Sequence, residues 1–376
     1  MARRHTPYYH KLVALDAELV DRIGYDAALR FTSVAEEHIA TRERVGVYDV
    51  YHQGALDLKG PDAEALLAHL LVNDPTRIDD GGVLYSSLCN AAGGMVDDLT
   101  VYRLSAEHFW LCPTPSRVDV VDAWIRDHTD GRRAYLTNIV SGTAFLSLQG
   151  PRSRETLAAM TDVDLSTEAL PYYRFTRGIV AEVPALIART GYSGELGYEL
   201  FFPREYAEHL WDAAFAAGAP FGIAPCGLGA LRSVRMEKKY PLYGLDLSEA
   251  TSPLEASLGW TVRFDRGDFL GRDALLRQRD EGVTRRLVGI ELGPGDPLPK
   301  AGDTISASEG ETVVGSVTSS DIGHFLGRTL AMGYVPPAIA ADGTPVTVTS
   351  AETGAALAGI VRTKAFYDPD RERVRA

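Results

Sequence analysis

Two neighbouring carboxylates, Asp97 and Asp98, stand between a glycine pair and a β-branched, apolar run. The pair Gly93-Gly94 is typical of a turn, and residues 96–102 predict a strand whose successive side chains point to opposite faces. Asp97 and Asp98 therefore cannot serve the same site. A carboxylate among apolar neighbours costs free energy unless it has a partner. We expect at least one of the two to face a polar pocket, and an aspartate that caps the glycine turn is the alternative.

A second polar segment, residues 49–54, lies within the strand-like stretch 45–58. It is unusually polar for a strand and ends on glycine, which favours a place beside a pocket. His52 belongs to this segment. A structural histidine whose ring nitrogens are satisfied is the alternative to a catalytic one.

Three glycines, Gly191, Gly194 and Gly197, recur within seven residues and are followed by alternating polar and apolar positions. Glycine allows the backbone to approach a flat ligand closely, and Tyr192 and Glu199 would supply a ring and a carboxylate. The alternative is an ordinary glycine-rich hairpin.

A predicted helix after Gly227 places Arg235 on its apolar stripe, because Leu228, Leu231 and Arg235 have the spacing i, i+3 and i+7. An inward arginine needs an anion, which is either a protein carboxylate or a ligand. The sequence carries no dinucleotide fingerprint, no Walker A motif, no H-E-x-x-H motif and no paired-cysteine metal signature, so no nucleotide or metal site is predicted.

The composition is that of a globular protein with more than one core. Of 376 residues, 45% are hydrophobic and 24% are charged, and the net charge is −13. This charge argues against non-specific binding to nucleic acid or to an anionic membrane. The three cysteines are far apart and unpaired in pattern, which indicates a reducing compartment. There is no apolar leader or membrane span, so a cytoplasmic location is expected.

The spacing of apolar residues predicts the elements around these candidates. Residues 11–45 have helical spacing, with a partly exposed polar helix over 33–44. The order strand, Gly-Pro, helix occurs twice, over 56–71 and again over 146–160, which predicts two related α+β halves. Short alternating strands from 284 to 376 predict a small β-barrel or sandwich.

Taken in order, the motifs resemble the glycine-cleavage T-protein (aminomethyltransferase) superfamily of tetrahydrofolate-dependent one-carbon transferases. The resemblance covers essentially the whole chain and rests on several segments. These are Asp49-Val50-x-His52-x-Gly54, Gly93-Gly94-x-x-Asp97-Asp98-Leu99, Arg189-Thr190-Gly191-Tyr192-x-Gly194-Glu195, Arg235-Met236-Glu237, Thr251-Ser252-Pro253-Leu254-Glu255 and Phe366-Tyr367-Asp368-Pro369.

The resemblance implies a fold and a site. The fold would be a three-subdomain cloverleaf, with a folate-binding α+β domain of two related subdomains over 1–276 and a C-terminal β-barrel over 277–376. Asp98 matches the catalytic aspartate, and Glu199 matches the carboxylate that holds the pterin. The residues expected to contact tetrahydrofolate are Tyr85, Tyr192, Glu199 and Tyr240, with Arg235 and Arg362 as candidates for its anionic tail.

Some positions depart from the T-protein pattern. Tyr51 and Gln53 replace a serine and a methionine around His52, and these three residues are expected to form the substrate pocket. Leu231 stands where the family has a folate-contacting arginine. The C-terminal half looks more similar to the folate domain of dimethylglycine and sarcosine dehydrogenases.

The function implied is transfer of a methyl or methylene group between a small methylated or aminomethyl donor and folate N5. One alternative is an N-, O- or S-demethylase that yields 5-methyl-tetrahydrofolate. A second is a glycine-cleavage aminomethyltransferase that acts on a lipoyl carrier protein. A third, from another class, is a non-catalytic folate-binding subunit of a flavoprotein oxidase.

Overall fold

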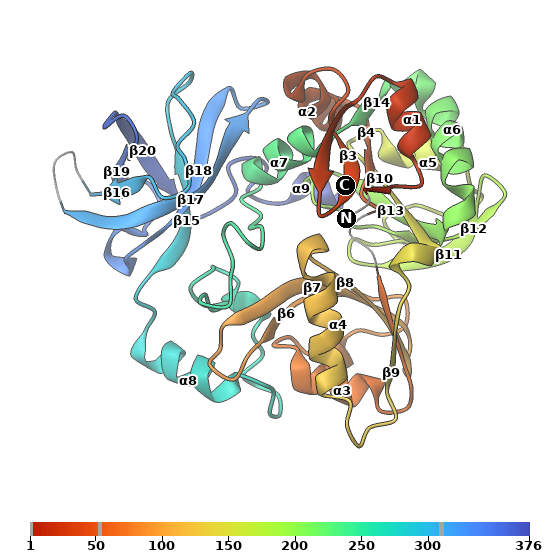
Figure 1. The fold of residues 1–376 in the computed structure, drawn as a ribbon, viewed down its shortest axis with the longest axis horizontal. Coiled ribbons are helices and arrows are strands. Elements are labelled where there is room, and N and C mark those ends of the chain that lie inside the picture. Colours follow the sequence, from red (N-terminus) through yellow and green to blue (C-terminus); the bar gives the residue numbers. More distant parts are fainter. Residues whose placement is uncertain (1–2, 52–54, 308–311) are drawn as a thin grey trace.

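The computed structural model describes residues 3–51, 55–307 and 312–376. Three blocks of secondary structure surround a central region, and the chain passes between the blocks through long connections (Figure 1). Two blocks combine a sheet with helices, and the third is a closed barrel at the C-terminal end. The expected α+β class and the C-terminal barrel are therefore confirmed.

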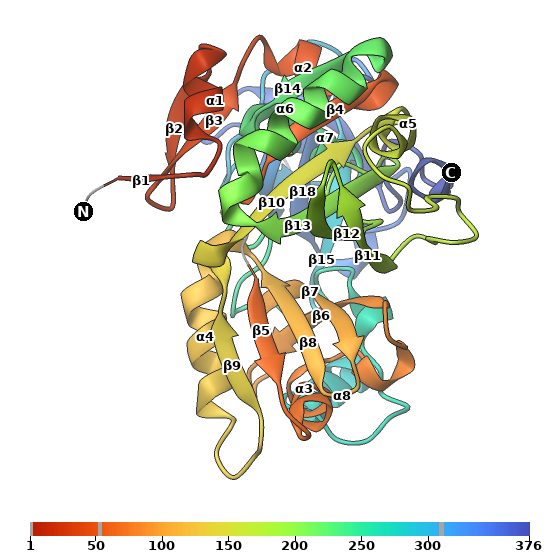
Figure 2. The ribbon, with the colours of Figure 1, turned by 90° about the vertical axis from the view of Figure 1, so that its right-hand side faces the viewer.

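The first block is built on a mixed sheet with the strand order β11-β12-β13-β10-β4-β14. Helix α6 lies across one face of this sheet (Figure 2). The strands are β4 (Val45–Asp49), β10 (Thr143–Gln149), β11 (Phe175–Val180), β12 (Val183–Ala188), β13 (Gly197–Pro203) and β14 (Ile223–Cys226). The helices are α2 (Val34–Glu43), α5 (Ser153–Ala158), α6 (Ala207–Gly218) and α7 (Leu228–Glu237).

The N-terminal segment differs from the helix expected over 11–45. After the short helix α1 (Tyr9–Ala14), strands β2 (Glu18–Arg22) and β3 (Tyr25–Arg30) form a hairpin, and β1 (Arg4–His5) pairs with β3. Ile23 and Gly24 form its turn with φ of 51° and 77°, which is the backbone of a tight, strand-matched turn. The helical prediction was wrong here because an Ile-Gly turn lacks the usual Asn-Gly signature.

Helix α2 forms where a polar helix was expected, but it is largely buried. Its Glu37, His38 and Arg42 are at most 1% exposed. Ser33 caps the helix by accepting a hydrogen bond from the amide of Glu36. The polar pattern that suggested solvent exposure instead serves an internal network, in which Arg42 pairs with Glu237 at 2.8 Å.

The second block contains the sheet β6-β7-β8-β5-β9, with helix α4 along one face (Figure 2). Its strands are β5 (Leu56–Lys59), β6 (Val83–Cys89), β7 (Met95–Ser105), β8 (His108–Pro113) and β9 (Tyr135–Asn138). Its helices are α3 (Ala63–Leu70) and α4 (Val118–Asp127). The expected strand over 96–102 is thus the middle of β7.

The two α+β blocks repeat one local structure. Strand β5 leads through Gly60 into α3, and β10 leads through Gly150 into α5, with φ of +130° at both glycines. A Cβ would lie 2.1 Å from the carbonyl oxygen of Arg133 at Gly60, and 2.5 Å from that of Arg44 at Gly150. Only glycine fits such a position, so the predicted relation between the two halves has a structural basis.

Helix α8 (Arg272–Glu281) leads into the C-terminal block, which closes as the barrel β15-β18-β17-β16-β19-β20, and α9 (Glu372–Arg375) follows it. The strands are β15 (Arg286–Glu291), β16 (Thr304–Ser306), β17 (Val313–Gly323), β18 (Arg328–Val335), β19 (Pro345–Thr349) and β20 (Ala356–Arg362). The division of the chain after 276 stays a prediction. Among the described residues, no helix combines the length and the apolarity needed to cross a membrane.

Candidate active site

Asp98 lies on β7 with one oxygen held and one free. The Tyr85 hydroxyl, on the neighbouring strand β6, donates a hydrogen bond of 2.7 Å to Asp98 Oδ2. Asp98 Oδ1 is buried and has no hydrogen-bond partner among the described residues. Burial raises the pKa of Asp98, and the Tyr85 hydrogen bond opposes that rise. A buried acceptor without a partner is the kind of atom that a ligand satisfies.

Asp97 points to the opposite face, as alternation along the strand predicted. It is fully buried, and its Oδ2 accepts a hydrogen bond of 2.8 Å from the amide of Thr114. Burial and the charge of Asp98 raise its pKa. Asp97 thus lies inside the second block, and Asp98 is the carboxylate on the side of Tyr85.

Aromatic rings gather beside Asp98. The rings of Tyr192 and Tyr240 stack at a centroid distance of 5.7 Å, and those of Tyr85 and Trp260 stack at 5.9 Å. Burial raises the pKa of Tyr85, and the charge of Asp98 adds to this rise. Burial is also the main cause of the raised pKa of Tyr192, to which Asp98 contributes. The structure therefore brings Tyr85, Tyr192 and Tyr240 together with Asp98.

Glu199, on β13, is 8% exposed and accepts hydrogen bonds from Thr190 Oγ1 at 2.6 Å and from the Tyr102 hydroxyl at 3.3 Å. Both bonds fall on Oε2, which leaves Oε1 without a hydrogen bond from the described residues. Burial raises the pKa of Glu199. The charge of Glu199 also acts on Tyr173, whose pKa is raised mainly by burial and then by Tyr240 and Glu199.

The glycines of the 191–197 segment make room for protein atoms and not for a ligand. A Cβ on Gly191 or Gly197 would lie 2.0 or 2.3 Å from Gln149 Oε1, and one on Gly194 would meet Lys238 at 1.9 Å. The close approach expected of these glycines therefore involves neighbouring side chains. It packs the loop that carries Tyr192 against β10 and α7.

Arg235 has a carboxylate of the protein as its partner. Its guanidinium donates to Asp246 Oδ2 at 2.9 Å and to the carbonyl oxygen of Tyr240 at 3.0 Å. Asp246 also accepts hydrogen bonds from Thr318 and Ser319 of β17. The sequence left two partners open for Arg235, a protein carboxylate or a ligand, and the structure shows a protein carboxylate. A role for Arg235 in ligand binding stays a prediction.

Arg362 lies at the end of β20, where its Nε donates to Glu291 Oε2 at 2.8 Å. Its role toward a folate tail stays a prediction. Tyr51 is 1% exposed and packs edge-on against Tyr25 at 5.8 Å in the core of the first block. Its place in a substrate pocket also stays a prediction, and His52 and Gln53 lie outside the described residues.

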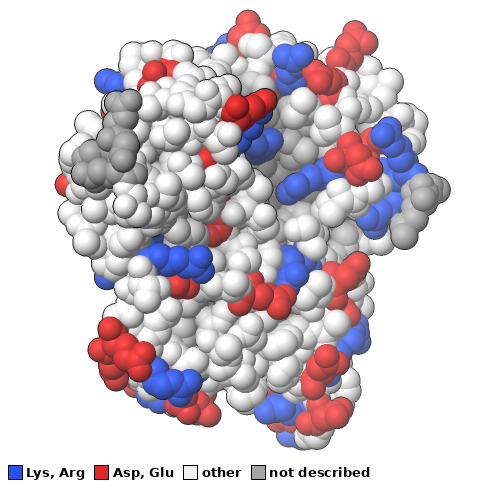
Figure 3. Space-filling view, turned by 60° about the vertical axis from the view of Figure 1, so that its left-hand side comes forward, with Lys and Arg blue, Asp and Glu red and all other residues white. Residues whose placement is uncertain are grey.

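Three residues that sequence reasoning did not single out contribute to this region. Trp260 is 57% exposed and stacks on Tyr85, Tyr173 lies beside Tyr240 and Glu199, and Asp246 holds Arg235. Trp260 is one of only four tryptophans in the chain. Large aromatic side chains are usually buried, so an exposed tryptophan marks a candidate contact surface, but the exposure of Trp260 is visible only in the structure. Figure 3 shows a hollow in the surface where the blocks meet, with Lys and Arg side chains at its edge.

Two family models cover most of the chain. The GCVT N-terminal domain matches residues 8–266, and the glycine cleavage T-protein C-terminal barrel domain matches residues 285–368. The chain belongs to the glycine-cleavage T-protein family. This agrees with the resemblance in the motifs, and the second match falls on the barrel β15 to β20.

Curated relatives and a solved structure agree with this assignment. The aminomethyltransferase of Halothermothrix orenii is 38% identical over 92% of this chain and 95% of its own length. That of Moorella thermoacetica is 40% identical over 92% and 93%. The crystal structure of glycine cleavage system aminomethyltransferase T from Bartonella henselae superposes with a TM-score of 0.88 at 27% identity, covering 97% of this chain and 98% of that one. The three-subdomain T-protein fold is therefore confirmed.

A member of this family is a folate-dependent one-carbon transferase, and tetrahydrofolate is its one-carbon carrier. The residues fit such a ligand. Stacked tyrosines match a flat ring, and the free oxygen of Asp98 matches an N–H or a cationic group. The roles of these residues toward tetrahydrofolate stay predictions.

Proposed function

We propose that the one-carbon donor of this enzyme is an amine that carries the transferable carbon as an aminomethyl or N-methyl group. The observation that carries this proposal is the free Oδ1 of Asp98 beside the tyrosine rings. A carbon leaving an amine nitrogen develops positive charge, and a fixed carboxylate nearby stabilises it. A neutral donor without a developing cation would gain nothing from that carboxylate.

Tetrahydrofolate, when bound, supplies a nucleophilic nitrogen that takes up the carbon. The chain's own residues hold the reactants and keep water out. Tyr192 and Tyr240 offer stacked faces to a flat ring, and Glu199 offers Oε1 to its N–H groups. Trp260 stands over Tyr85 at the exposed side, where its ring shields the Tyr85–Asp98 pair from solvent.

Tyr85 sets the charge state of Asp98. Its hydroxyl donates to the carboxylate form, which favours ionisation against the effect of burial. It also fixes the carboxylate plane, so that Oδ1 keeps one orientation. In this role Tyr85 positions Asp98 in addition to any contact that its ring makes with the folate.

The names of the relatives favour an aminomethyl group, because proteins 38% and 40% identical to this chain are aminomethyltransferases. In that case the donor would be held by a lipoyl carrier protein. Tyr51 and Gln53 stand where the family motif has serine and methionine, and this difference favours another donor, a small N-methylated amine. Both candidates are amines, so Asp98 has the same task in each.

The test is anaerobic incubation of the protein with tetrahydrofolate and a panel of donors, with methyl- and methylene-folate distinguished by mass spectrometry. The panel contains N-methylated amines, aminomethyl-lipoamide, and methoxy and methylthio compounds. We expect product from one of the amine classes only. Product from the oxygen or sulfur donors alone would contradict the proposal, and folate binding without any product would identify a non-catalytic folate-binding subunit.

A further inference from the structure

The chain returns from the barrel to the first block after β20. This C-terminal segment, residues 366–376, includes the short helix α9, which lies beside the first block (Figure 1). The amide of Tyr367 donates a hydrogen bond of 2.9 Å to the carbonyl oxygen of Glu237, at the end of α7. The carbonyl oxygen of Ala376 accepts one of 2.8 Å from Arg154 of α5. The C-terminal segment therefore connects the barrel to the helices of the first block.

Lys238 links the C-terminal segment to the loop that carries Tyr192, residues 189–196. Lys238 follows α7 and is buried. Its ammonium group donates to the carbonyl oxygen of Asp368 at 2.9 Å and to Asp368 Oδ2 at 3.0 Å. Its aliphatic stem lies against Gly194, where an added Cβ would come within 1.9 Å of Lys238 Cγ. One side chain thus contacts both the C-terminal segment and the loop.

Glu195 provides a second link between the same two parts. Its buried carboxylate pairs with Arg42 of α2 at 3.2 Å and with Arg373 of α9 at 3.4 Å. Arg373 also donates to the Tyr367 hydroxyl at 2.9 Å, and the Arg42 guanidinium lies 4.2 Å from the centre of the Tyr367 ring. Cations from α2 and from the C-terminal segment therefore hold the loop at this residue.

The backbone of Asp368 is fixed in an unusual conformation. Its φ is 45°, in the left-handed region that residues with a side chain rarely adopt. Its carboxylate accepts hydrogen bonds from the amides of Glu372 at 2.8 Å and of Arg373 at 3.3 Å. Such a conformation persists only where the surrounding contacts hold it. The pair with Lys238 and these two hydrogen bonds supply those contacts.

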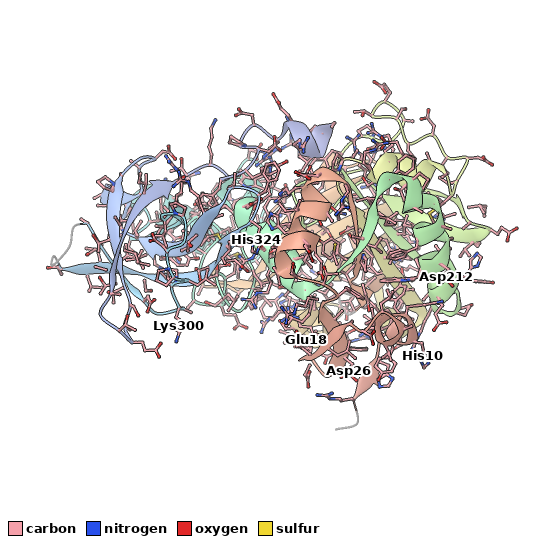
Figure 4. All side chains as sticks on the ribbon, turned by 90° about the horizontal axis from the view of Figure 1, so that it is seen from above. His10, Glu18, Asp26, Asp212, Lys300 and His324 are labelled. Carbon is pink, nitrogen blue, oxygen red and sulfur yellow. The ribbon has the colours of Figure 1, made fainter. Side chains whose placement is uncertain are left out.

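The barrel is anchored at the same end of α7. Glu237 Oε1 accepts a hydrogen bond of 3.1 Å from the amide of Phe325, in the turn between β17 and β18. The ring of His324 lies edge-on to that of His38 on α2, with 5.5 Å between the centroids, and Figure 4 shows His324 where the barrel meets the first block. The barrel and the C-terminal segment that follows it are thus both attached beside the Tyr192 loop.

We propose that Lys238 is a positioning residue for the folate site, because it clamps the C-terminal segment onto the loop 189–196 and so holds the ring of Tyr192 in place. The Tyr192 hydroxyl donates a hydrogen bond of 2.6 Å to the carbonyl oxygen of Pro241, which fixes the far end of the ring. Lys238 fixes the backbone end, because Gly194 is only two residues from Tyr192. A ring that is already held in place loses less conformational freedom when a flat ligand binds.

This role rests on the expected contact of Tyr192 with the folate ring, and it does not depend on the proposed amine donor. The test therefore uses 6-methyltetrahydropterin, which has the ring of tetrahydrofolate without its tail. Calorimetry measures its binding at a temperature at which melting curves show every variant to be folded. Hydrogen exchange of the amides in residues 189–196 gives a second measurement, which reports on the loop itself.

The main variant is Lys238→Met, which keeps an unbranched stem against Gly194 but removes the ammonium group. Asp368→Asn removes the partner charge, and asparagine tolerates the left-handed backbone, so this variant decides if Lys238→Met does not fold. Lys239→Met is the matched control, because the Lys239 ammonium group donates to the carbonyl oxygens of residues 362 and 363 at the end of β20. Tyr192→Leu removes the ring.

We expect Lys238→Met and Asp368→Asn each to lose about tenfold in affinity for 6-methyltetrahydropterin, because the ring must then be ordered on binding. The double variant should lose no more than either single variant, since both break one contact. Amides of the loop should exchange faster in both variants and regain protection when the pterin binds. Lys239→Met should change the affinity by less than about twofold.

Wild-type affinity and exchange in the folded Lys238→Met or Asp368→Asn variant would overturn the positioning role, and so would an equal loss in Lys239→Met. In that case weak binding by Tyr192→Leu would still leave the contact between Tyr192 and the folate ring in place. Wild-type affinity in Tyr192→Leu would overturn that contact and the positioning role together. None of these measurements involves a donor, so the proposed amine donor is tested separately.

Discussion

At the scale of single residues, the account depends on two adjacent aspartates with different surroundings. Each carboxylate keeps one buried oxygen without a hydrogen bond from the described residues, but the other oxygen of Asp97 accepts from the Thr114 amide inside the second block, whereas that of Asp98 accepts from the Tyr85 hydroxyl beside the aromatic rings. Strand alternation predicted this opposition from the sequence. The Tyr85–Asp98 contact was not predictable in the same way, because it depends on the pairing register of β6 and β7.

The pH dependence of turnover tests the role of Tyr85. Asp98 must be ionised to stabilise a cation, and its pKa is raised, so turnover should increase with pH until this group has lost its proton. Tyr85→Phe removes a hydrogen bond to the ionised carboxylate of Asp98, so the pH at which turnover rises should move up by about one to two units. Tyr135→Phe, at an exposed ring, is the control. An unchanged pH dependence in Tyr85→Phe would show that this bond does not tune Asp98.

Glu199 gives a test of the folate contacts. Glu199→Ala should weaken tetrahydrofolate binding by about 1.5–3 kcal/mol, because a charge-assisted hydrogen bond is lost. Calorimetry measures this against Glu205→Ala, which removes an exposed carboxylate just after β13. Equal affinity in the two variants would remove Glu199 from the binding site.

Asp97 should affect stability more than catalysis. Asp97→Asn keeps an oxygen for the Thr114 amide, so the free energy of unfolding should fall by only about 1 kcal/mol, which corresponds to a few degrees in melting temperature. Turnover should stay near that of the wild type. A carboxyl whose folded pKa is raised stabilises the protein fully below its unfolded pKa, near 4, and loses that contribution as pH rises toward the folded value. Melting curves from pH 4 upward should therefore decline less in Asp97→Asn than in the wild type. A steeper decline in the variant would contradict the assignment.

At the scale of elements, sequence patterns predicted the pieces with strong local signals. The strand at β7, the helix after Gly227 and the C-terminal barrel all follow periodicity and turn residues. The hairpin β2–β3 was missed, because its Ile-Gly turn has no strong signature. Tyr173, in a turn, and Trp260, in the short 3-10 helix Gly259–Thr261, were also missed, since their roles arise only from contacts across the fold.

The paired glycines give a prediction at this scale. Gly60→Ala and Gly150→Ala place a Cβ against a carbonyl oxygen at positive φ, and each should lower the free energy of unfolding by about 1–3 kcal/mol or more. Gly142→Ala is the matched control, because no atom lies within 4 Å of its added Cβ. Denaturant unfolding measures the three variants. If Gly142→Ala destabilises as much as the others, the tight approach at Gly60 and Gly150 is not the cause.

At the scale of the whole molecule, the candidate active site forms only where the three blocks of the chain pack together. Asp98 and Tyr85 come from the second block, Tyr192 and Glu199 from the first, and the barrel fixes Asp246 through β17. Tyr240 and Trp260 come from the long connection between α7 and α8. No single block carries the site, so a fragment that contains one block should not bind folate as the full chain does. Sequence alone identified this family from motifs, but it could not show which side chains meet at the centre.

The most direct measurement of the central claim is turnover of the Asp98→Asn variant with the donor identified from the panel, alongside its affinity for tetrahydrofolate. The substitution keeps the size of the side chain and an acceptor for the Tyr85 hydroxyl, but it removes the charge that would stabilise a developing cation. We predict a fall in kcat of about 10²-fold or more, with the fold intact and folate affinity within about threefold of the wild type. Wild-type turnover in Asp98→Asn, or its loss in Asp97→Asn instead, would contradict the account.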